Sequence, residues 1–365
     1  MKIKDILAHL EQIFPLKYQE EFDNCGVQCG NTNYECTGAL VCFEMSDETI
    51  DEALRCGANL VISHHPLILR KGIQKIEPTN RVGRIICQAL ENKMVLYSMH
   101  TNIDSAPGGI NDLFAEKLCL QDKKVLVPQN AGLRKISVFV PHTHTNQVKE
   151  SLFDAGCGNI GNYSHCAYTL SGRGSFMANE QANPFIGEAG KLELVEEERV
   201  EMVFPRELQN RVISALYASH PYEEPAYDIY DLANPSAAVG LGRIGNLPET
   251  TDAKDFLLSL KKIFEVDAIR YYGDLSKPIR RVAVCGGGGS SFISNALAGK
   301  ADAYVCGDIK YHDFHTADSK MLIADIGHLE SEVFVKEIIF NELKKKFTNF
   351  AVSFSKSEKM RIGII

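Results

Sequence analysis

Several features that would point to a membrane or a nucleic acid as the main partner are missing from this sequence. No apolar run reaches the roughly 18–20 residues that a membrane-spanning helix needs. The N-terminal stretch MKIKDILAHLEQIF contains Asp5, His9 and Glu11, so it predicts an amphipathic helix rather than a signal peptide. No block dense in Lys and Arg occurs, and the net charge is −8. This charge argues against nucleic acid or an anionic membrane surface as a partner.

The sequence also lacks pairs of cysteines with CxxC spacing. Its 11 cysteines are odd in number, and several lie in apolar stretches, such as Cys42, Cys87 and Cys306. This usage predicts reduced, buried thiols in a cytoplasmic protein. Cys25 and Cys29 could bind one metal ion together, but without a second pair the buried-thiol interpretation is favoured.

The length of 365 residues predicts two or three domains. In residues 1–127, apolar stretches alternate with helical patterns. Strands are expected over 39–44, 59–63 and 94–99, and helices over 46–56, 79–92 and 108–119. Near-continuous apolar strands separated by helices predict a parallel sheet covered on both faces.

The last third, residues 247–365, repeats this plan. The stretch ALRCGANLVIS before His64 parallels ALAGKADAYVC before Gly307, and residues 93–100 parallel residues 320–328. Chance similarity between apolar strands is the alternative, but the matching order of elements favours an internal duplication. We therefore predict an α/β protein with two related halves.

Residues 128–246 have a different pattern of hydrophobic and polar residues. Their hydrophobic pattern predicts the order β-α-β-β-α-β, with residues 163–177 as a strand or hairpin arm and, overlapping them, residues 171–190 as a long loop rich in Gly, Ser and Asn. We interpret this segment as a ferredoxin-like α+β domain inserted between the two α/β halves.

Three segments place possible metal ligands directly after expected strands. They carry His64 and His65, then His100 and Asp104, then His328 and Glu332. Strand ends are where open α/β sheets bind ligands. Three histidines and two carboxylates from these segments exceed the needs of one four-coordinate ion and suit two neighbouring ones. Taken singly, each would be interpreted as a buried histidine or a capping acid.

The last of these segments is expected to begin a long helix. Ser331 is a plausible N-cap, which would place Glu332 in the first turn, where negative charge is favoured.

Two further segments could take part in chemistry. GDIKYHDFH contains Asp308, Lys310, Tyr311, His312 and His315 and follows an expected strand. These residues could support the metal ligands, contact substrate or donate a proton, or they could form an ordinary polar loop.

The glycine-rich stretch CGGGGSS, residues 285–291, lies between an expected strand and helix. It could bind a phosphate or a dinucleotide cofactor. However, it matches neither G-x-G-x-x-G nor a P-loop, and tight packing is the alternative.

Histidines also occur in the inserted segment. His142 and His144 open it, and His220 precedes Glu223 and Glu224. Metal binding is conceivable for these groups, but exposed loop residues are the favoured interpretation.

Together, several motifs resemble those of the GTP cyclohydrolase 1 type 2 homologue family, also called Nif-three-like proteins. The motifs are DNCGVQCG (23–30), SHHPL (63–67), HTNID (100–104), GDIKYHD (307–313) and GHLESE (327–332). The inserted segment is similar to PII and CutA proteins through GNIGNYSHC (158–166), ANPFIGE (182–188), HPYEEPAYDIY (220–230) and VGLGRIG (239–245).

The resemblance implies a pair of divalent ions, Zn, Fe or Mn, bound by His64, His65, Asp104, His328 and Glu332. It also implies a toroidal homohexamer and hydrolytic opening of the GTP purine ring at C8 with loss of formate.

In that reaction His100 or His312 could act as general acid or base, and Asp308 and Lys310 could assist. Hydrolysis of another nucleotide or a phosphoester fits equally well. The alternatives are a non-enzymatic, metal-binding regulatory hexamer that senses a small ligand through its PII-like domain, and a nucleotide-cofactor oxidoreductase using CGGGGSS.

Overall fold

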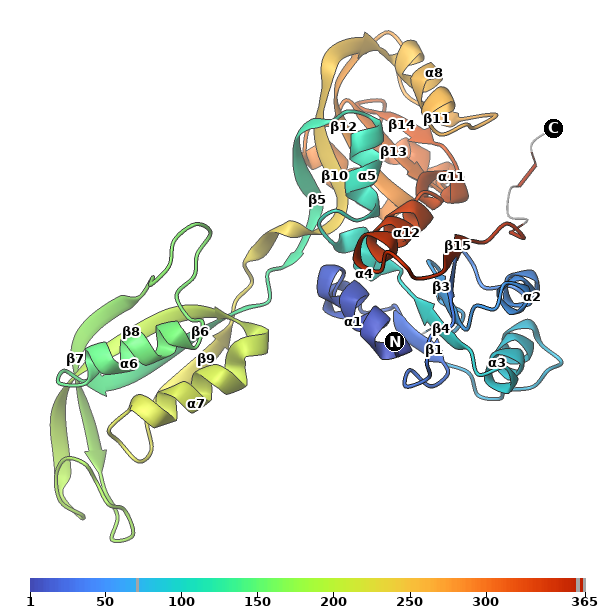
Figure 1. The fold of residues 1–365 in the computed structure, drawn as a ribbon. Helices are drawn as coiled ribbons and strands as arrows, with labels where there is room; N and C mark the ends of the chain where they lie inside the picture. Colours follow the sequence, from blue (N-terminus) through green and yellow to red (C-terminus); the bar gives the residue numbers. More distant parts are fainter. Residues whose placement is uncertain (70–71, 359–361, 364–365) are drawn as a thin grey trace. The chain divides into compact units, whose positions relative to one another are not determined.

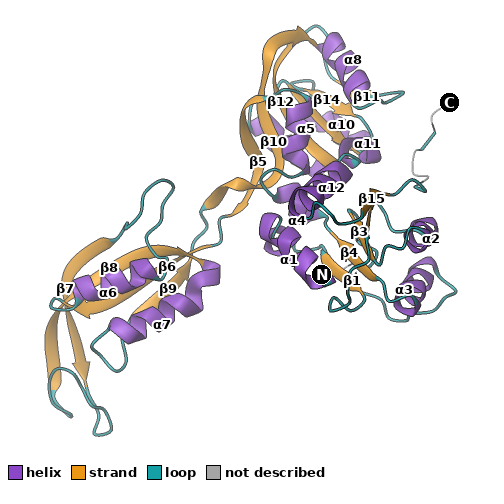
Figure 2. Cartoon of the chain, viewed as in Figure 1, coloured by secondary structure: helices purple, strands orange, loops and turns teal. Residues whose placement is uncertain are grey.

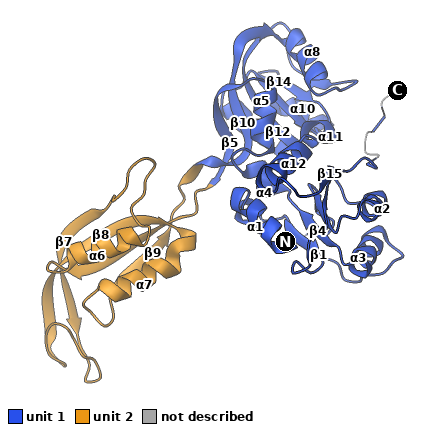
Figure 3. Ribbon diagram, in the orientation of Figure 1, with its two compact units in different colours: residues 1–129, 237–365 blue, residues 130–236 orange. Residues whose placement is uncertain are grey.

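The computed structural model describes residues 1–69, 72–358 and 362–363, and the chain divides into two compact units (Figure 3). Unit 1 comprises residues 1–129 and 237–365, and unit 2 comprises residues 130–236. The boundary expected at 246 lies instead inside one long strand, β10 (Pro235–Asp252), because residues 243–246 of that strand pair with β12 (Pro278–Gly288) in unit 1. Residues 237–246 therefore belong to unit 1.

The first sheet of unit 1 has the strand order β1–β4–β3–β2–β15 (Figure 1). Its strands are β1 (Gly26–Cys29), β2 (Ala39–Cys42), β3 (Leu60–Ser63), β4 (Val95–Ser98) and β15 (Val352–Phe354). The helices of this part are α1 (Ile3–Ile13), η1 (Leu16–Tyr18), α2 (Asp47–Arg55), α3 (Arg81–Glu91), α4 (Thr101–Ser105) and α5 (Ile110–Lys117). Strands β2, β3 and β4 are parallel, and β1 pairs antiparallel with β4.

The second sheet of unit 1 has the strand order β11–β14–β13–β12–β10–β5. Besides β10, its strands are β5 (Gln121–Asn130), β11 (Arg270–Tyr272), β12 (Pro278–Gly288), β13 (Ala303–Gly307) and β14 (Leu322–Asp325). The helices of this part are α8 (Ala253–Ile263), η3 (Ser290–Phe292), α9 (Ile293–Ala298), α10 (Tyr311–Phe314), η4 (His315–Ala317), α11 (His328–Glu332) and α12 (Val335–Lys346).

The two sheets share one plan. In each, three parallel strands follow one another, and the last of them pairs with an antiparallel edge strand: β4 with β1, and β14 with β11. This shared order supports the interpretation of two related halves. The halves also exchange strands, because β15 from the end of the chain pairs with β2, and β5 lies in the second sheet.

Alternating side chains of the parallel strands face two different layers. In β2, Val41 belongs to the large core shared by both sheets, whereas Leu40 packs in a cluster with α2 and α3. In the second sheet, Val305 joins the shared core, whereas Tyr304 packs on the opposite side, with α9. Both sheets are therefore buried on both faces, as their apolar sequences predict.

Unit 2 has the element order β6–α6–β7–β8–α7–β9, which is the β-α-β-β-α-β order predicted for it (Figure 2). Its elements are β6 (Leu133–Pro141), α6 (Thr145–Asp154), β7 (Tyr168–Met177), β8 (Leu192–Pro205), η2 (Arg206–Leu208), α7 (Gln209–Ser219) and β9 (Tyr227–Asp231). The strands form an antiparallel sheet in the order β7–β8–β6–β9, and α6 and α7 pack on its apolar side chains.

The expected loop over 171–190 is partly wrong. Residues 171–177 belong to β7 and pair with residues 192–198 of β8, so the loop spans only 178–191. The ladder hydrogen bonds of a long hairpin outweigh the turn preference of Gly172 and Gly174.

Within the described ranges, no helix has the length and apolar character needed to cross a bilayer. None of the eleven cysteines, all of which lie in those ranges, forms a disulfide in the structure, and Cys56 and Cys119 are exposed, so the prediction of buried thiols is wrong for these two.

Candidate metal centre

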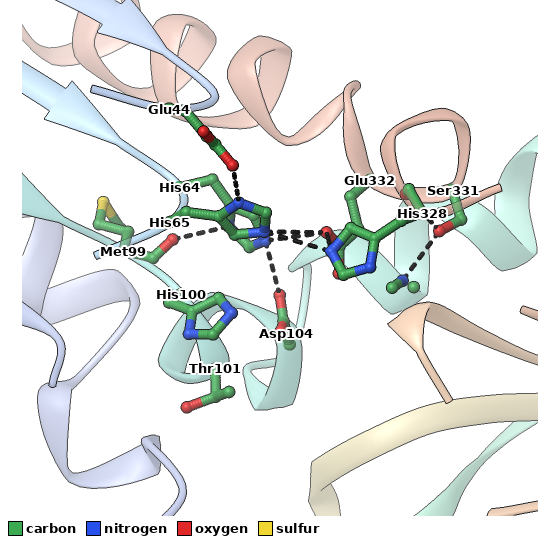
Figure 4. Close-up of polar contacts among 12 residues, drawn as sticks. Glu44, His64, His65, Met99, His100, Thr101, Asp104, His328, Ser331 and Glu332 are labelled. Atoms are coloured by element: carbon green, nitrogen blue, oxygen red, sulfur yellow. Dashed lines mark hydrogen bonds and ion pairs between the residues drawn. The ribbon is translucent and has the colours of Figure 1, made fainter. Parts of the chain in front are cut away.

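Side chains that follow four parallel strands converge in unit 1 (Figure 4). Glu44 follows β2, His64 and His65 follow β3, His100 follows β4, and His328 follows β14. These are the carboxyl ends of strands from both sheets, where α/β proteins place their ligand sites. The three segments singled out in the sequence therefore do meet.

His64 is fully buried, and its two ring nitrogens have different surroundings. Its Nδ1 lies 2.8 Å from the carbonyl oxygen of Met99, a group that can only accept, so Nδ1 carries the proton. Its Nε2 lies 3.9 Å from Asp104 Oδ1 and 3.6 Å from Glu332 Oε2. Burial lowers the pKa of His64 to about 4, despite the opposing effect of Glu332. The ring is therefore neutral, with its lone pair on Nε2, which is the tautomer that binds metals.

His65 is held in the same manner by a carboxylate. Its Nδ1 lies 3.1 Å from Glu44 Oε1, and its Nε2 lies 3.4 Å from Glu332 Oε2 and 3.3 Å from His328 Nε2. Burial acts to lower the pKa of His65, but the contacts with Glu332 and Glu44 outweigh it and raise the pKa to about 9. Without a cation, this imidazole therefore takes up a proton to balance the carboxylates.

His328 and Glu332 lie at positions i and i+4 of α11, so both project from one face of the helix. His328 Nε2 is 3.0 Å from Glu332 Oε2, and His328 Nδ1 is 2.7 Å from Asp308 Oδ2. The contact with Glu332 raises the pKa of His328 to about 9, and Asp308 adds to the shift.

Two buried carboxyl groups complete the centre, and they differ in charge. Burial acts to raise the pKa of Glu332, but its contacts with the surrounding imidazoles, His328 first, hold the pKa well below its usual value. Burial and the charge of Glu332 raise the pKa of Asp104 well above its usual value. Glu332 is thus ionised, and Asp104 is protonated. A divalent cation between them would stabilise both negative charges and so favour the ionised form of Asp104 as well.

These residues fit a metal site. Among the described residues, seven buried side-chain polar atoms make no hydrogen bond, and three of them lie together in this centre, namely His64 Nε2, Asp104 Oδ1 and Glu332 Oε2. Buried polar atoms without partners are rare in native proteins, and here all three are potential ligand atoms. The described part of the chain contains three groups of potential ligand atoms, and the atoms of each group lie within 4.8 Å of one another. Two groups share Glu332, one with His64 and Asp104 and one with His65 and His328, and the third consists of His64, His65 and His100.

The glycine-rich segment 285–291 makes room for Glu332. A Cβ on Gly287, whose φ is +64°, would lie 2.0 Å from Glu332 Oε1. The amide of Gly286 donates to Asn111 Oδ1, and that of Gly287 donates to Ser331 Oγ. These amides are already used within the fold, and the segment lies at the end of β12. Close packing therefore accounts for the glycines better than a phosphate or dinucleotide site does.

The chain matches one family model over residues 1–361, described as Duf34/NIF3 (NGG1p interacting factor 3). A relative from Halalkalibacterium halodurans is 42% identical over 346 residues and covers 93% of both chains. Another, from Bacillus subtilis, is 41% identical over 344 residues and covers 93% of this chain and 91% of the relative. The chain belongs to the Duf34/NIF3 family.

Both relatives carry the name GTP cyclohydrolase 1 type 2 homolog, which states a relationship rather than an activity. Among solved structures, a Bacillus cereus protein related to NIF3 is 37% identical, with a TM-score of 0.77 over 100% of this chain and 99% of the other. A Staphylococcus aureus protein is 27% identical, with a TM-score of 0.81 over the same shares. The fold is therefore that of the Duf34/NIF3 proteins.

In this Duf34/NIF3 chain, His100 lies beside the candidate ligands. Its ring centroid is 5.2 Å from that of His64 and 5.3 Å from that of His65. The Nδ1 atom of His100 is 2.9 Å from Asp23 Oδ1. Burial acts to raise the pKa of Asp23, but the contact with His100 outweighs burial and holds this pKa well below its usual value. Asp23 thus fixes the orientation of His100, leaving Nε2 for a ligand or a proton transfer.

The segment after β13 is only partly brought to the centre. Asp308 holds His328 in place, as an assisting residue would. Lys310 lies with an exposed side chain at the start of α10, and His312 is exposed with its ring 5.3 Å from that of Tyr311. Among the described residues whose ligand atoms cluster, His312 does not appear. The geometry therefore places His100, but not His312, beside the candidate ligands.

Sequence reasoning missed two residues and misplaced one helix start. Glu44 and Asp23, which orient His65 and His100, are single carboxylates with no spacing signal. Ser331 is not an N-cap, because α11 already begins at His328 and α12 is a separate helix. The hydroxyl of Ser331 instead donates to the His328 carbonyl and accepts from the Gly287 amide.

Proposed function

We propose that this chain is a metal-dependent hydrolase with a dinuclear centre, and that Glu332 is the carboxylate shared by both ions. The observation that carries the proposal is the set of three buried ligand atoms without hydrogen-bond partners, one of which belongs to Glu332. His64 and Asp104 would complete one site, and His65 and His328 would complete the other. Adjacent histidines that each serve a different ion explain why two imidazoles follow β3 directly.

The donor set consists of imidazoles and carboxylates without a thiolate. Zn, Fe and Mn all accept such ligands, and two divalent ions per chain are expected. When bound, such a pair supplies Lewis acidity toward a carbonyl or phosphoryl oxygen and activates water near neutral pH.

The surrounding residues have separate tasks. Glu44 and Asp308 fix the orientation of two candidate ligands through their Nδ1 atoms. His100 is partly exposed, with its side chain at 22% of full exposure, and it is oriented by Asp23. It is therefore placed to move a proton to or from a substrate, which is the role of general acid or base.

A nucleotide is the first substrate class to test, because the curated relatives are named after an enzyme that acts on GTP. Ring opening of GTP would release formate, whereas phosphoester hydrolysis would release phosphate or an alcohol. The experiment is to supply metal-loaded protein with GTP, other nucleotides and phosphodiesters and to follow these products.

We expect turnover that disappears in His65→Ala and falls about 10²–10⁴-fold in His100→Gln, with metal content kept in the latter. His142→Gln, in unit 2, is the matched control and should retain full activity. If protein carrying two ions turns over none of these compounds, the hydrolase proposal is wrong. A metal-binding regulatory assembly would then be the better account.

A further inference from the structure

Unit 2 contains a cavity of about 670 Å³, which lies in the size range of small-molecule sites. It forms where the loop 178–191 meets the loop 220–226 beside the end of β7. Two motifs noted in the sequence, ANPFIGE and HPYEEPAYDIY, supply much of its wall. All of its lining residues lie in unit 2, so the cavity is separate from the candidate metal centre.

Aromatic rings form one part of the wall. The ring of Tyr222 lies 6.1 Å from that of Phe176 and 6.3 Å from that of Phe185, measured between centroids. The planes are inclined by 59° and 48°, so the three rings line the cavity from different directions. The wall thus presents the aromatic surface of three residues to one ligand.

The remaining polar wall is acidic. Glu197 lines the cavity although it is only 8% exposed, and the hydroxyl of Tyr222 donates to its Oε1 at 3.0 Å. Glu223 and Glu224 also line the cavity, and none of its described lining residues is Lys, Arg or His. A buried carboxylate is costly unless a cation balances it. A cationic ligand would supply the balancing charge that the described lining residues do not.

The fold holds these walls in place. His220 Nε2 donates to the carbonyl oxygen of Phe139 at 2.9 Å, and His220 Nδ1 accepts from the Tyr222 amide at 3.1 Å. His220 is therefore a buried structural residue, not the exposed loop residue expected from the sequence, and both its nitrogens are occupied. Glu223 accepts from the amide of Asn183, which ties the two loops together.

We propose that this cavity binds a small organic cation with an alkylated ammonium group. The rings attract positive charge through their π faces but accept no strong hydrogen bond, so they favour a cation that needs none. Glu197 supplies the counter-charge at the buried end. The site goes beyond the proposed hydrolase function and does not depend on it.

The test is isothermal titration of the full-length protein with choline and with 3,3-dimethyl-1-butanol, its uncharged analogue of the same shape. Choline should bind, and the neutral alcohol should bind at least about tenfold more weakly. Only choline carries the positive charge that interacts with the aromatic rings and with the carboxylate of Glu197. Tetramethylammonium and benzyltrimethylammonium extend the comparison to smaller and larger cations.

Variants assign the binding to this cavity. Glu197→Gln and Phe185→Ala should each weaken choline binding about tenfold. Phe185 is 53% exposed, so we expect Phe185→Ala to fold normally even if Glu197→Gln disturbs the fold. Circular dichroism checks that both variants are folded. His65→Ala should leave choline binding unchanged, which separates this site from the metal centre.

Three results would overturn the proposal. They are the absence of binding for all three ammonium compounds, equal affinity for choline and its neutral analogue, and choline affinity that neither cavity variant alters.

Discussion

At the residue scale, the candidate centre consists of imidazoles that are fixed on one side and open on the other. In His64, His65 and His328 an oxygen atom holds Nδ1, while Nε2 faces Glu332 within 3.6 Å. This arrangement fixes the orientation of the three rings before any ion arrives. His64 already has its lone pair on Nε2, whereas His65 and His328 must release their Nε2 proton on binding.

Substitution of Asp308 tests this orienting role. Asp308→Asn keeps a residue that tolerates its φ of +55° but removes the charge beside His328 Nδ1. Metal affinity, measured by competition with a chromophoric chelator, should fall about 10–100-fold. Asp318→Asn is the matched control, because Asp318 also has a positive φ and its side chain is 86% exposed. Equal losses in both variants, or none in either, would contradict the role.

The sequence predicted which residues would meet but not what orients them. His64, His65 and His328 follow apolar strands, so strand ends and the family resemblance were enough to place them. Glu44 and Asp23 could not be found in this way, because a lone acid after a strand or in a loop has many possible roles. Their contacts with His65 and His100 form only when β2 and the loop before β1 pack beside the histidines.

At the element scale, β12 and α11 fit together closely enough to position Glu332. Gly287 leaves the space that the Glu332 carboxylate occupies, and Ser331 accepts from the Gly287 amide. The apolar sequence pattern correctly predicted the strand β12. The pattern could not predict the break between α11 and α12, because it depends on this contact between residues more than 40 positions apart.

Neighbouring glycines provide a matched test of this packing. Gly287→Ala would bring a Cβ to 2.0 Å from Glu332 Oε1 and would also strain a backbone with positive φ. We expect it to displace Glu332, to lower metal content, and to destabilise the fold by about 1–3 kcal/mol in urea titrations. A Cβ on Gly288 meets nothing within 4 Å, so Gly288→Ala should retain near-normal metal content and stability. If Gly287→Ala also keeps its metal, the packing argument fails.

A buried ion pair joins α5 to β10. Arg243 is 3% exposed and contacts both carboxylate oxygens of Asp112, at 2.7 and 2.9 Å. Burial acts to raise the pKa of Asp112, but Arg243 outweighs it and lowers the pKa below its usual value. The folded state therefore binds a proton less readily than the unfolded state, and the stabilisation is complete only above the unfolded pKa.

We expect Asp112→Asn to lose about 3 kcal/mol of unfolding free energy at neutral pH, because it leaves a buried guanidinium without its counter-charge. The difference from the parent protein should stay constant down to about pH 5 and shrink below about pH 4, as Asp112 becomes protonated in the parent. Urea titrations at several pH values measure this difference. A difference that grows as the pH falls would have the wrong sign for this mechanism.

At the scale of the whole molecule, the candidate metal centre belongs to unit 1 and the acidic aromatic cavity to unit 2. A change in the spacing of hydrophobic residues predicted the inserted unit. The predicted end of this unit, residue 246, lies ten residues too far along the chain, because β10 continues without a break from unit 2 into unit 1. The ring of six chains implied by the resemblance stays a prediction, and a solution mass of six times 40.5 kDa would support it.

Removal of unit 2 tests the separation of the two sites. Residues 127 and 240 lie side by side on β5 and β10, since a Cβ on Gly240 would be 2.2 Å from the Val127 oxygen. A short Gly-Ser linker in place of residues 130–236 should therefore leave unit 1 folded. We expect this variant to keep its metal ions and to lose choline binding. Loss of the ions from a folded variant would show that the centre depends on unit 2.

The central claim is that Glu332 is shared by two ions, and metal stoichiometry tests it most directly. The protein is purified without chelators, loaded with Zn, Fe or Mn, and analysed by mass spectrometry of the elements, alongside Glu332→Gln and the control Glu330→Gln. The account predicts two equivalents per chain in the parent and the control, and at most one in Glu332→Gln. A parent protein that contains no transition metal and takes up none on addition would contradict it.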